Sequence, residues 1–459
     1  MAKQQTTDFT KGKIFGPLFK FAGPVFLANL LQVMYGAVDL IIVGKFGLTA
    51  DVSAVSTGSQ LTSTITNVLF CLAMGTTVLL GQYLGEGRKE ECGRVIGGGI
   101  ALFGGIAAAL TVLIPILAPW LSGVFNAPPE AFDRTVSYVR ICMYGTVFIV
   151  AYNLLGSIMR GMGDSKTPLL SVAIACVLNI AGDYLLVARC GMGSAGAAIA
   201  TVAAQAVSVV ICLFVIRKRG LPFPFSGKDI RFDKDVISGI MKLGVPLALE
   251  EFLVCVSFLV ILALVNSLGV IVSAGVGVAE KICGFVMLIP TSLAASICTF
   301  TAQNYGAGRD DRSVRGLRYA QGVSFGISLF VFWLSFFHGD LLAHLFANDP
   351  DVIREASEYL KAYAIDSMLT SFMFCYNGYF NGIGHTKFVM FQGILSAFCI
   401  RIPVSFLMSR QVPVSVFHIG LATPCATFVQ CILGTVYFIY IHKKRQVVTG
   451  DNPSSLTTH

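Results

Sequence analysis

Long runs of hydrophobic residues, separated by short polar connections, dominate the chain. The runs reach the length of about 18 residues or more that crosses roughly 30 Å of hydrocarbon as a helix. In lipid a spanning backbone has to satisfy its own hydrogen bonds, and barrel strands would be shorter and alternating, so the runs are predicted to be helices. Twelve such segments lie at roughly 14–43, 52–80, 95–119, 135–159, 167–188, 194–216, 236–266, 272–300, 316–338, 358–382, 388–408 and 414–441.

Composition supports lipid as the solvent of this chain. Of its 459 residues, 55% are hydrophobic and only 13% are charged, whereas soluble domains carry about 25% charged residues. Most of the 33 lysines and arginines lie at the termini or after even-numbered segments. Because basic loops stay in the cytoplasm, both termini are predicted to be cytoplasmic. This placement also explains the net charge of +8 without a nucleic acid partner.

The two halves of the chain repeat each other. At a constant shift of 221 residues, polar loop residues recur in register: Gln82, Gly85, Gly87, Arg88, Phe125, Pro129, Tyr138, Gly161, Gly163 and Lys166 meet Gln303, Gly306, Gly308, Arg309, Phe346, Pro350, Tyr359, Gly382, Gly384 and Lys387. A fixed register over such distances marks an internal repeat. We therefore predict a six-helix lobe at 1–216, a cytoplasmic linker at 217–235, a second six-helix lobe at 236–441 and a cytoplasmic tail at 442–459.

Six helices per repeat place the two lobes in the same orientation across the membrane. Parallel repeats of this kind suit alternating access, in which two bundles rock around a site between them. The predicted fold is thus an all-α polytopic membrane protein with 12 transmembrane helices in two pseudo-symmetric bundles around a central cavity.

Few ionisable residues lie inside the spans of the first half. Asp39 and Gln32 are seven residues apart on the first helix, and Asn179 and Asp183 are four apart on the fifth, so each pair shares one helix face. If the two faces meet, the carboxylates share a proton or bind a hard cation such as Na⁺ through oxygen atoms. A purely structural hydrogen bond between helices is the alternative for each of these side chains.

The second half offers a different set of polar residues within spans: Glu250, Glu251, Asp366 and Arg401. Buried charges are expensive and mark substrate or ion pathways, so we assign these four to the substrate cavity. Arg401 is expected to pair with an acid of its own lobe, Asp366 or a glutamate. Structural pairing and substrate contact are both open for this set.

Pro24 interrupts the hydrogen bonding of the first helix and permits a kink. Because it shares this helix with Asp39, it is our candidate hinge, with a fixed structural kink as the alternative.

Several stretches together resemble the multidrug and toxic compound extrusion (MATE) family, closest to its prokaryotic DinF-like branch. They are Leu-Gln-Val-Met-Tyr-Gly-Ala-Val-Asp ending at Asp39, the segment Gly161–Pro168, Asn179-x-x-x-Asp183, and the repeated Gln-x-x-Gly-x-Gly-Arg beginning at Gln82 and Gln303. The similarity covers about residues 13–441. Their joint order and spacing carries the resemblance, since no single motif is decisive.

The resemblance implies a secondary multidrug exporter that exchanges organic, mostly cationic amphiphilic compounds for H⁺ or Na⁺. It implies an ion site at Asp39, Asn179 and Asp183, with Gln32, Asn153 and Thr201 as further polar contributors. The ion site that some members carry in the second lobe does not transfer, because Cys255 stands where they have a glutamate.

The expected setting is the bacterial cytoplasmic membrane, where the protein works as a monomer in the lipid bilayer, with no cofactor beyond the coupling ion. A flippase or native-metabolite exporter of the same architecture is the alternative. No nucleophile–base or metal cluster points to an enzyme.

Overall fold

The computed structural model describes residues 7–411 and 413–449, and every regular element in this part of the chain is a helix. The predicted tail 442–459 falls partly on residues 450–459, which lie outside the described residues. The last helix continues beyond its predicted end at 441.

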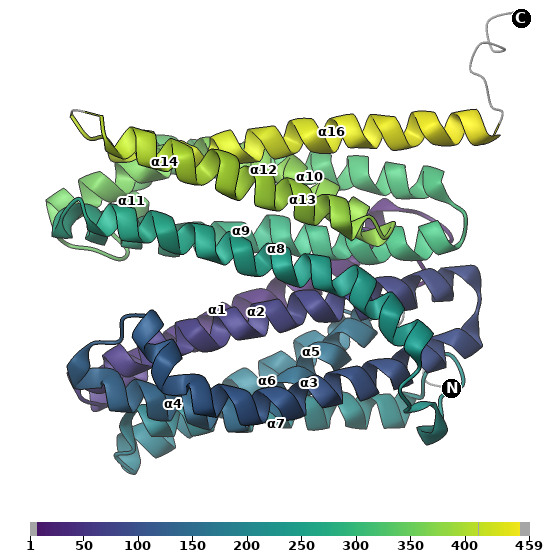
Figure 1. The fold of residues 1–459 in the computed structure, drawn as a ribbon, viewed down its shortest axis with the longest axis horizontal. Helices are drawn as coiled ribbons and strands as arrows, with labels where there is room; N and C mark the ends of the chain where they lie inside the picture. The colour runs from purple at the N-terminus through teal and green to yellow at the C-terminus, as the bar shows by residue number, and fades with distance from the viewer. Residues whose placement is uncertain (1–6, 412, 450–459) are drawn as a thin grey trace, which may run out of the picture. The chain divides into compact units, whose positions relative to one another are not determined.

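Helices of the first half lie side by side with their long axes nearly parallel, from α1 to α7 (Figure 1). They are α1 (Phe15–Phe46), α2 (Thr49–Glu86), α3 (Lys89–Val124), η1 (Pro129–Ala131), α4 (Phe132–Tyr144), α5 (Thr146–Gly161), α6 (Lys166–Asp183), the π-helical η2 (Tyr184–Arg189) and α7 (Gly193–Arg219), followed by η3 (Gly227–Asp229) in the linker.

The second half repeats this order. Its elements are α8 (Lys234–Asn266), α9 (Val270–Gly306), α10 (Asp310–Phe337), α11 (Gly339–Ala343), α12 (Pro350–Gly382), α13 (Thr386–Ser396), the π-helical η4 (Ala397–Arg401), α14 (Ile402–Ser409), α15 (Val416–Gly420) and α16 (Ala422–Thr449).

All twelve predicted segments coincide with helices. Among the described residues, ten helices are long and apolar enough to cross a membrane, and the pair Pro129–Tyr144 and Thr146–Gly161, bent by 53°, makes an eleventh candidate. The remaining segment is α12, which has the length of a span but too many polar residues to pass the same test. In the second repeat α12 stands at the position of the bent pair of the first repeat, and it is a single unbroken helix.

The repeat is visible in the backbone as well as in the sequence. Gly87 and Gly308 both have positive φ (76° and 67°), and so do Gly163 and Gly384 (80° and 83°). Each pair is separated by the same 221 residues. Left-handed backbone of this kind is accessible to glycine at little cost, so the repeated glycines end corresponding helices in the same way.

The chain forms two compact units that interleave in sequence. One contains Met1–Cys255, Met287–Ala320 and Gly378–Met390, and the other contains Val256–Val286, Gln321–Asn377 and Phe391–His459. The units do not follow the predicted lobe boundaries at 216 and 236. Those boundaries therefore stay a prediction.

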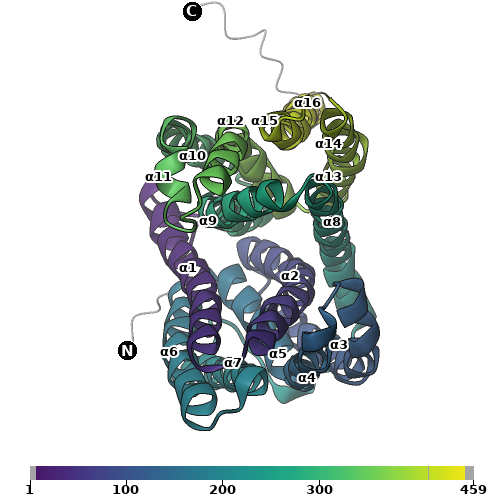
Figure 2. The same ribbon diagram turned by 90° about the vertical axis from the view of Figure 1, so that its left-hand side faces the viewer.

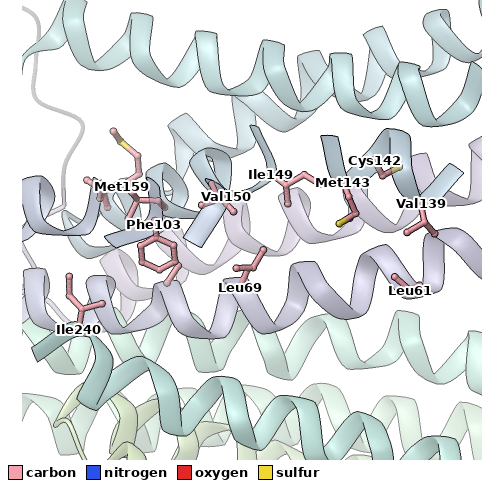
Figure 3. Packing of buried hydrophobic residues seen from close by; sticks show 14 of the residues in the cluster. Leu61, Leu69, Phe103, Val139, Cys142, Met143, Ile149, Val150, Met159 and Ile240 are labelled. Carbon is pink, nitrogen blue, oxygen red and sulfur yellow. The ribbon is translucent and has the colours of Figure 1, made fainter. Parts of the chain in front are cut away.

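The largest apolar core lies in the first of these units. Viewed end-on in Figure 2, α1, α6 and α7 are neighbours, and so are α3, α4 and α5. In Figure 3 side chains of α2, α3, α4, α5 and α8 meet along this core, among them Leu69, Phe103, Met143, Ile149 and Ile240. Burial by neighbouring helices keeps these groups in fixed positions, which gives the polar residues nearby a rigid frame.

Close helix contact in the second repeat depends on Gly378 of α12. A β-carbon at this position would lie 3.0 Å from Ala294 Cα of α9. We expect Gly378→Val to destabilise the protein by about 1–3 kcal/mol, since the backbone of α9 cannot move aside cheaply. The melting temperature in detergent checks this, with the exposed Gly322→Val, which meets nothing within 4 Å, as the control. Equal melting of both variants would contradict the prediction.

Candidate functional site

Three helices of the first half bring Asp39, Asn179, Asp183 and Thr201 together. Asp39 comes from α1, Asn179 and Asp183 from α6, and Thr201 from α7. The Thr201 hydroxyl donates to Asp39 Oδ2 at 3.3 Å, and the Asn179 amide donates to Thr201 Oγ1 at 3.5 Å. Asp39 is 4% exposed and Asn179 and Asp183 are 0% exposed, so these three side chains are buried.

The carboxyl groups of Asp39 and Asp183 lie close enough to influence each other electrostatically. Asp183 is the last residue of α6, and the π-helical turn η2 follows immediately. Such π-helical turns change the direction of side chains and are frequent at functional sites. Two neighbouring carboxyl groups in a buried place cannot both carry a free charge at low cost, because nothing screens their repulsion.

Four oxygen atoms of this cluster have no hydrogen-bond donor among the described residues. They are Asp39 Oδ1, both carboxyl oxygens of Asp183, and Asn179 Oδ1. Oxygen ligands are those that hard cations prefer, and a proton shared between the two acids would satisfy part of the same set. The donor set therefore fits either H⁺ or Na⁺.

The other predicted members of this site have local partners. Gln32 donates to the hydroxyl of Tyr152 at 3.4 Å. Asn153 is buried and its amide donates to Ile149 O of its own helix at 2.9 Å. Pro24 lies within α1, which continues through it from Phe15 to Phe46.

In the second unit, Asp366 of α12 and Arg401 of η4 form a buried polar pair. Asp366 is 0% exposed and Arg401 6% exposed, and the two charges interact, although no nitrogen–oxygen distance between them is within 4.0 Å. Arg401 donates to Ser257 Oγ at 3.2 Å and lies 4.4 Å from the centroid of the Phe258 ring. Arg401 ends a π-helical turn, as Asp183 precedes one.

Glu250 and Glu251 lie half-buried on α8. The Cys255 thiol lies 3.8 Å from Glu251 Oε1, so Cys255 contacts the acid one turn earlier on the same helix. No described lysine or arginine forms an ion pair with either of them.

Arg160 is a polar residue that the sequence pattern did not single out. The predicted fourth segment ended at 159 and left Arg160 in a loop, but it lies half-buried in the last turn of α5. Its guanidinium donates to Ser157 Oγ at 2.9 Å and lies 4.7 Å from the centroid of the Phe70 ring. Its only sequence signal is its place directly before Gly161, where the helix ends.

The family model described as MatE matches the chain twice, at residues 24–185 and 246–407. The two matches cover most of the chain and start 222 residues apart, which agrees with the internal repeat.

Several known proteins are similar along nearly their whole length. "Probable multidrug resistance protein YpnP" of Bacillus subtilis is 26% identical, covering 92% of this chain and 95% of that protein. "Multidrug export protein MepA" of Staphylococcus aureus is 23% identical, covering 89% and 90%. A solved MATE transporter in an outward-facing conformation superimposes with a TM-score of 0.87 at 19% identity, covering 95% of this chain and 97% of the other. This structural similarity shows that the chain has the fold of that transporter.

Proposed function

Because the chain belongs to the MatE family of multidrug resistance transporters, we propose that it is a secondary active exporter that exchanges organic compounds for H⁺ or Na⁺. The relatives are transporters and not enzymes. The observation that carries the coupling proposal is the buried cluster of unpaired oxygen atoms on Asp39, Asn179 and Asp183. A site with two acids and no basic partner among the described residues changes its net charge when a cation enters or leaves.

Coupling requires that this change in charge alters a helix. Asp39 lies on α1, as does Pro24, where the helix lacks one backbone hydrogen bond. When a cation occupies the site, the carboxyl groups of Asp39 and Asp183 no longer repel each other, and α1 can pack closely against α6. When the site empties, repulsion favours a rearranged α1 with Pro24 as the hinge. Both helices belong to the predicted lobe 1–216.

The substrates that we propose are mostly cationic amphiphiles. Glu250, Glu251 and Asp366 supply negative charge in apolar surroundings, and a desolvated acid attracts an organic cation strongly. The transporter works in the bacterial cytoplasmic membrane as a monomer with both termini in the cytoplasm, as the distribution of basic residues favours. Gln32, Asn153 and Thr201 would support the ion site by holding its helices together.

One observation favours a second function, the export of an anionic metabolite or the flipping of a lipid headgroup. Arg160 lies half-buried against Phe70 without an ion pair to any described carboxylate, and an arginine in this state is a ready partner for phosphate or carboxylate. Two arginines, the half-buried Arg160 and the buried Arg401, are few for a headgroup path, so the multidrug exporter is the leading proposal.

The purified protein in liposomes tests these proposals. We expect a cationic dye to move against its gradient when either a proton gradient or a sodium gradient alone is imposed, and the effective gradient identifies the coupling ion. The substrate should in turn dissipate a pre-formed gradient of that ion. Transport that is indifferent to both gradients but requires a lipid-linked substrate would overturn the antiporter in favour of the flippase.

A further inference from the structure

We propose that residues 7–12, called the strap below, form a releasable latch that keeps the C-terminal ends of α2 and α9 together. The inference goes beyond the coupling site and rests on the proposed alternating access only in one respect. It assumes that these helix ends separate when the transporter opens to the cytoplasm. All contacts that carry it lie within one compact unit, which contains residues 1–255, 287–320 and 378–390.

Two glutamines at equivalent positions of the repeat form hydrogen bonds to the ends of other helices. Gln82 at the end of α2 donates to Gly382 O at 2.9 Å, and Gln303 at the end of α9 donates to Gly161 O at 2.9 Å. Each glutamine thus bonds the helix end that belongs to the other repeat. We call these four residues the clasp.

Glycines allow the two helices to approach at the clasp. The backbone of Gln303 would collide with a β-carbon on Gly85, and the backbone of Gln82 would collide with one on Gly306. Nearby, Val78, Cys298 and Ala302 form a small buried apolar cluster. The helices are therefore tightly packed at this point.

The strap is bound to one side of this closed arrangement through its backbone. Gln303 Oε1 accepts from Phe9 N at 3.3 Å, and Asn304 donates to Phe9 O at 3.2 Å. Arg312 donates to Phe9 O at 3.0 Å, to Lys11 O at 3.3 Å and to Gly12 O at 2.9 Å. The side-chain nitrogen of Gln303 thus donates to Gly161 within the clasp, and its side-chain oxygen accepts from the strap.

Phe9 fixes the strap by burial as well. It is 1% exposed, and its ring lies 5.4 Å from the ring centroids of both Phe21 and Phe300 in edge-on contacts. At the other end of the strap, Thr7 N donates to Gly163 O at 3.1 Å. The strap thus joins α1 and the α5–α6 turn of the first repeat to α9 and α10 of the second.

The strap can be released without breaking a helix, because residues 7–12 form no helix of their own. Three of its hydrogen bonds come from the single side chain of Arg312. Loss of this one guanidinium therefore removes a large part of what holds the strap.

Reactivity of the native thiol Cys298 tests the strap, because this residue is 0% exposed beside the clasp. With every other cysteine replaced, we expect N-ethylmaleimide to label Cys298 slowly in the otherwise unchanged protein. Arg312→Gln should speed labelling on the order of tenfold, since each lost hydrogen bond moves the opening equilibrium toward the open form. Phe9→Ala should act in the same direction and keeps the test valid if Arg312→Gln does not fold.

Arg315→Gln is the matched control, because Arg315 is exposed on the same helix and pairs with Asp311. Cys298 in Arg315→Gln should be labelled at the same rate as in the protein with Arg315. Folded Arg312→Gln and Phe9→Ala variants that label no faster than Arg315→Gln would overturn the strap. The assay needs neither substrate nor coupling ion, so it can succeed or fail independently of the proposed antiport.

Discussion

Asp39→Asn is expected to abolish ion-driven export while leaving a folded protein. Asparagine has nearly the same shape as aspartate, and its amide oxygen can still accept from the Thr201 hydroxyl, as Asp39 Oδ2 does. The site keeps Asp183 but loses one of its two charges. A proton then has no second carboxylate to share, and a sodium ion loses a charged ligand. Loss of a charged partner in a buried site costs several kcal/mol, so exchange should fall by about 100-fold or more.

Counterflow in proteoliposomes separates this loss of coupling from general damage. Downhill movement of a dye with no ion gradient should persist in Asp39→Asn, whereas uphill movement should vanish. Asp311→Asn, which removes an exposed acid paired with Arg315 on the surface of α10, should leave both rates unchanged. Full uphill transport by Asp39→Asn would remove Asp39 from the coupling site.

The fold was largely predictable because lipid imposes simple rules. Every apolar segment became a helix, and polar loop residues such as Gln82 and Gln303 revealed the repeat at a constant shift. The bend between α4 and α5 was not predictable, since it occurs at Gly145 while the second repeat has Asp366 at the corresponding position in an unbroken helix. The π-helical turns after Asp183 and before Ile402 were not predicted either, because the apolar pattern of these segments continues through them without a break.

The candidate site was predictable where helix periodicity places two polar residues on one face. Asn179 and Asp183 follow this rule, and Asp39 is the only acid in its segment. Thr201 came from the family resemblance, because a threonine in an apolar helix has no distinctive pattern. The strap was not predictable, because its bonds go from its backbone to side chains about 300 residues away, and backbone partners have no signature in the sequence.

Arg401→Gln is expected to destabilise the protein strongly, because the buried carboxyl group of Asp366 then loses the positive charge that compensates it. Neither carboxyl oxygen of Asp366 has a hydrogen-bond partner within normal distance among the described residues, and Arg401 supplies a compensating positive charge, second to the effect of Thr427. Removing one member of a buried pair typically costs about 3–5 kcal/mol. The melting temperature in detergent should drop clearly, and Asp366→Asn should produce a smaller drop, since Arg401 keeps Ser257 and Phe258 as neighbours.

The double variant decides between structural pairing and substrate contact, the two roles that the sequence left open. If the pair is structural, Asp366→Asn with Arg401→Gln should recover much of the stability lost in Arg401→Gln, because no uncompensated charge remains buried. Arg410→Gln is the matched control, as Arg410 also lies over a phenylalanine ring, Phe406, but is exposed. Single variants that melt normally yet raise the KM for a cationic dye would instead assign Asp366 and Arg401 to the substrate. In that case the second half would contribute recognition, and the acids of the first half would carry the coupling alone.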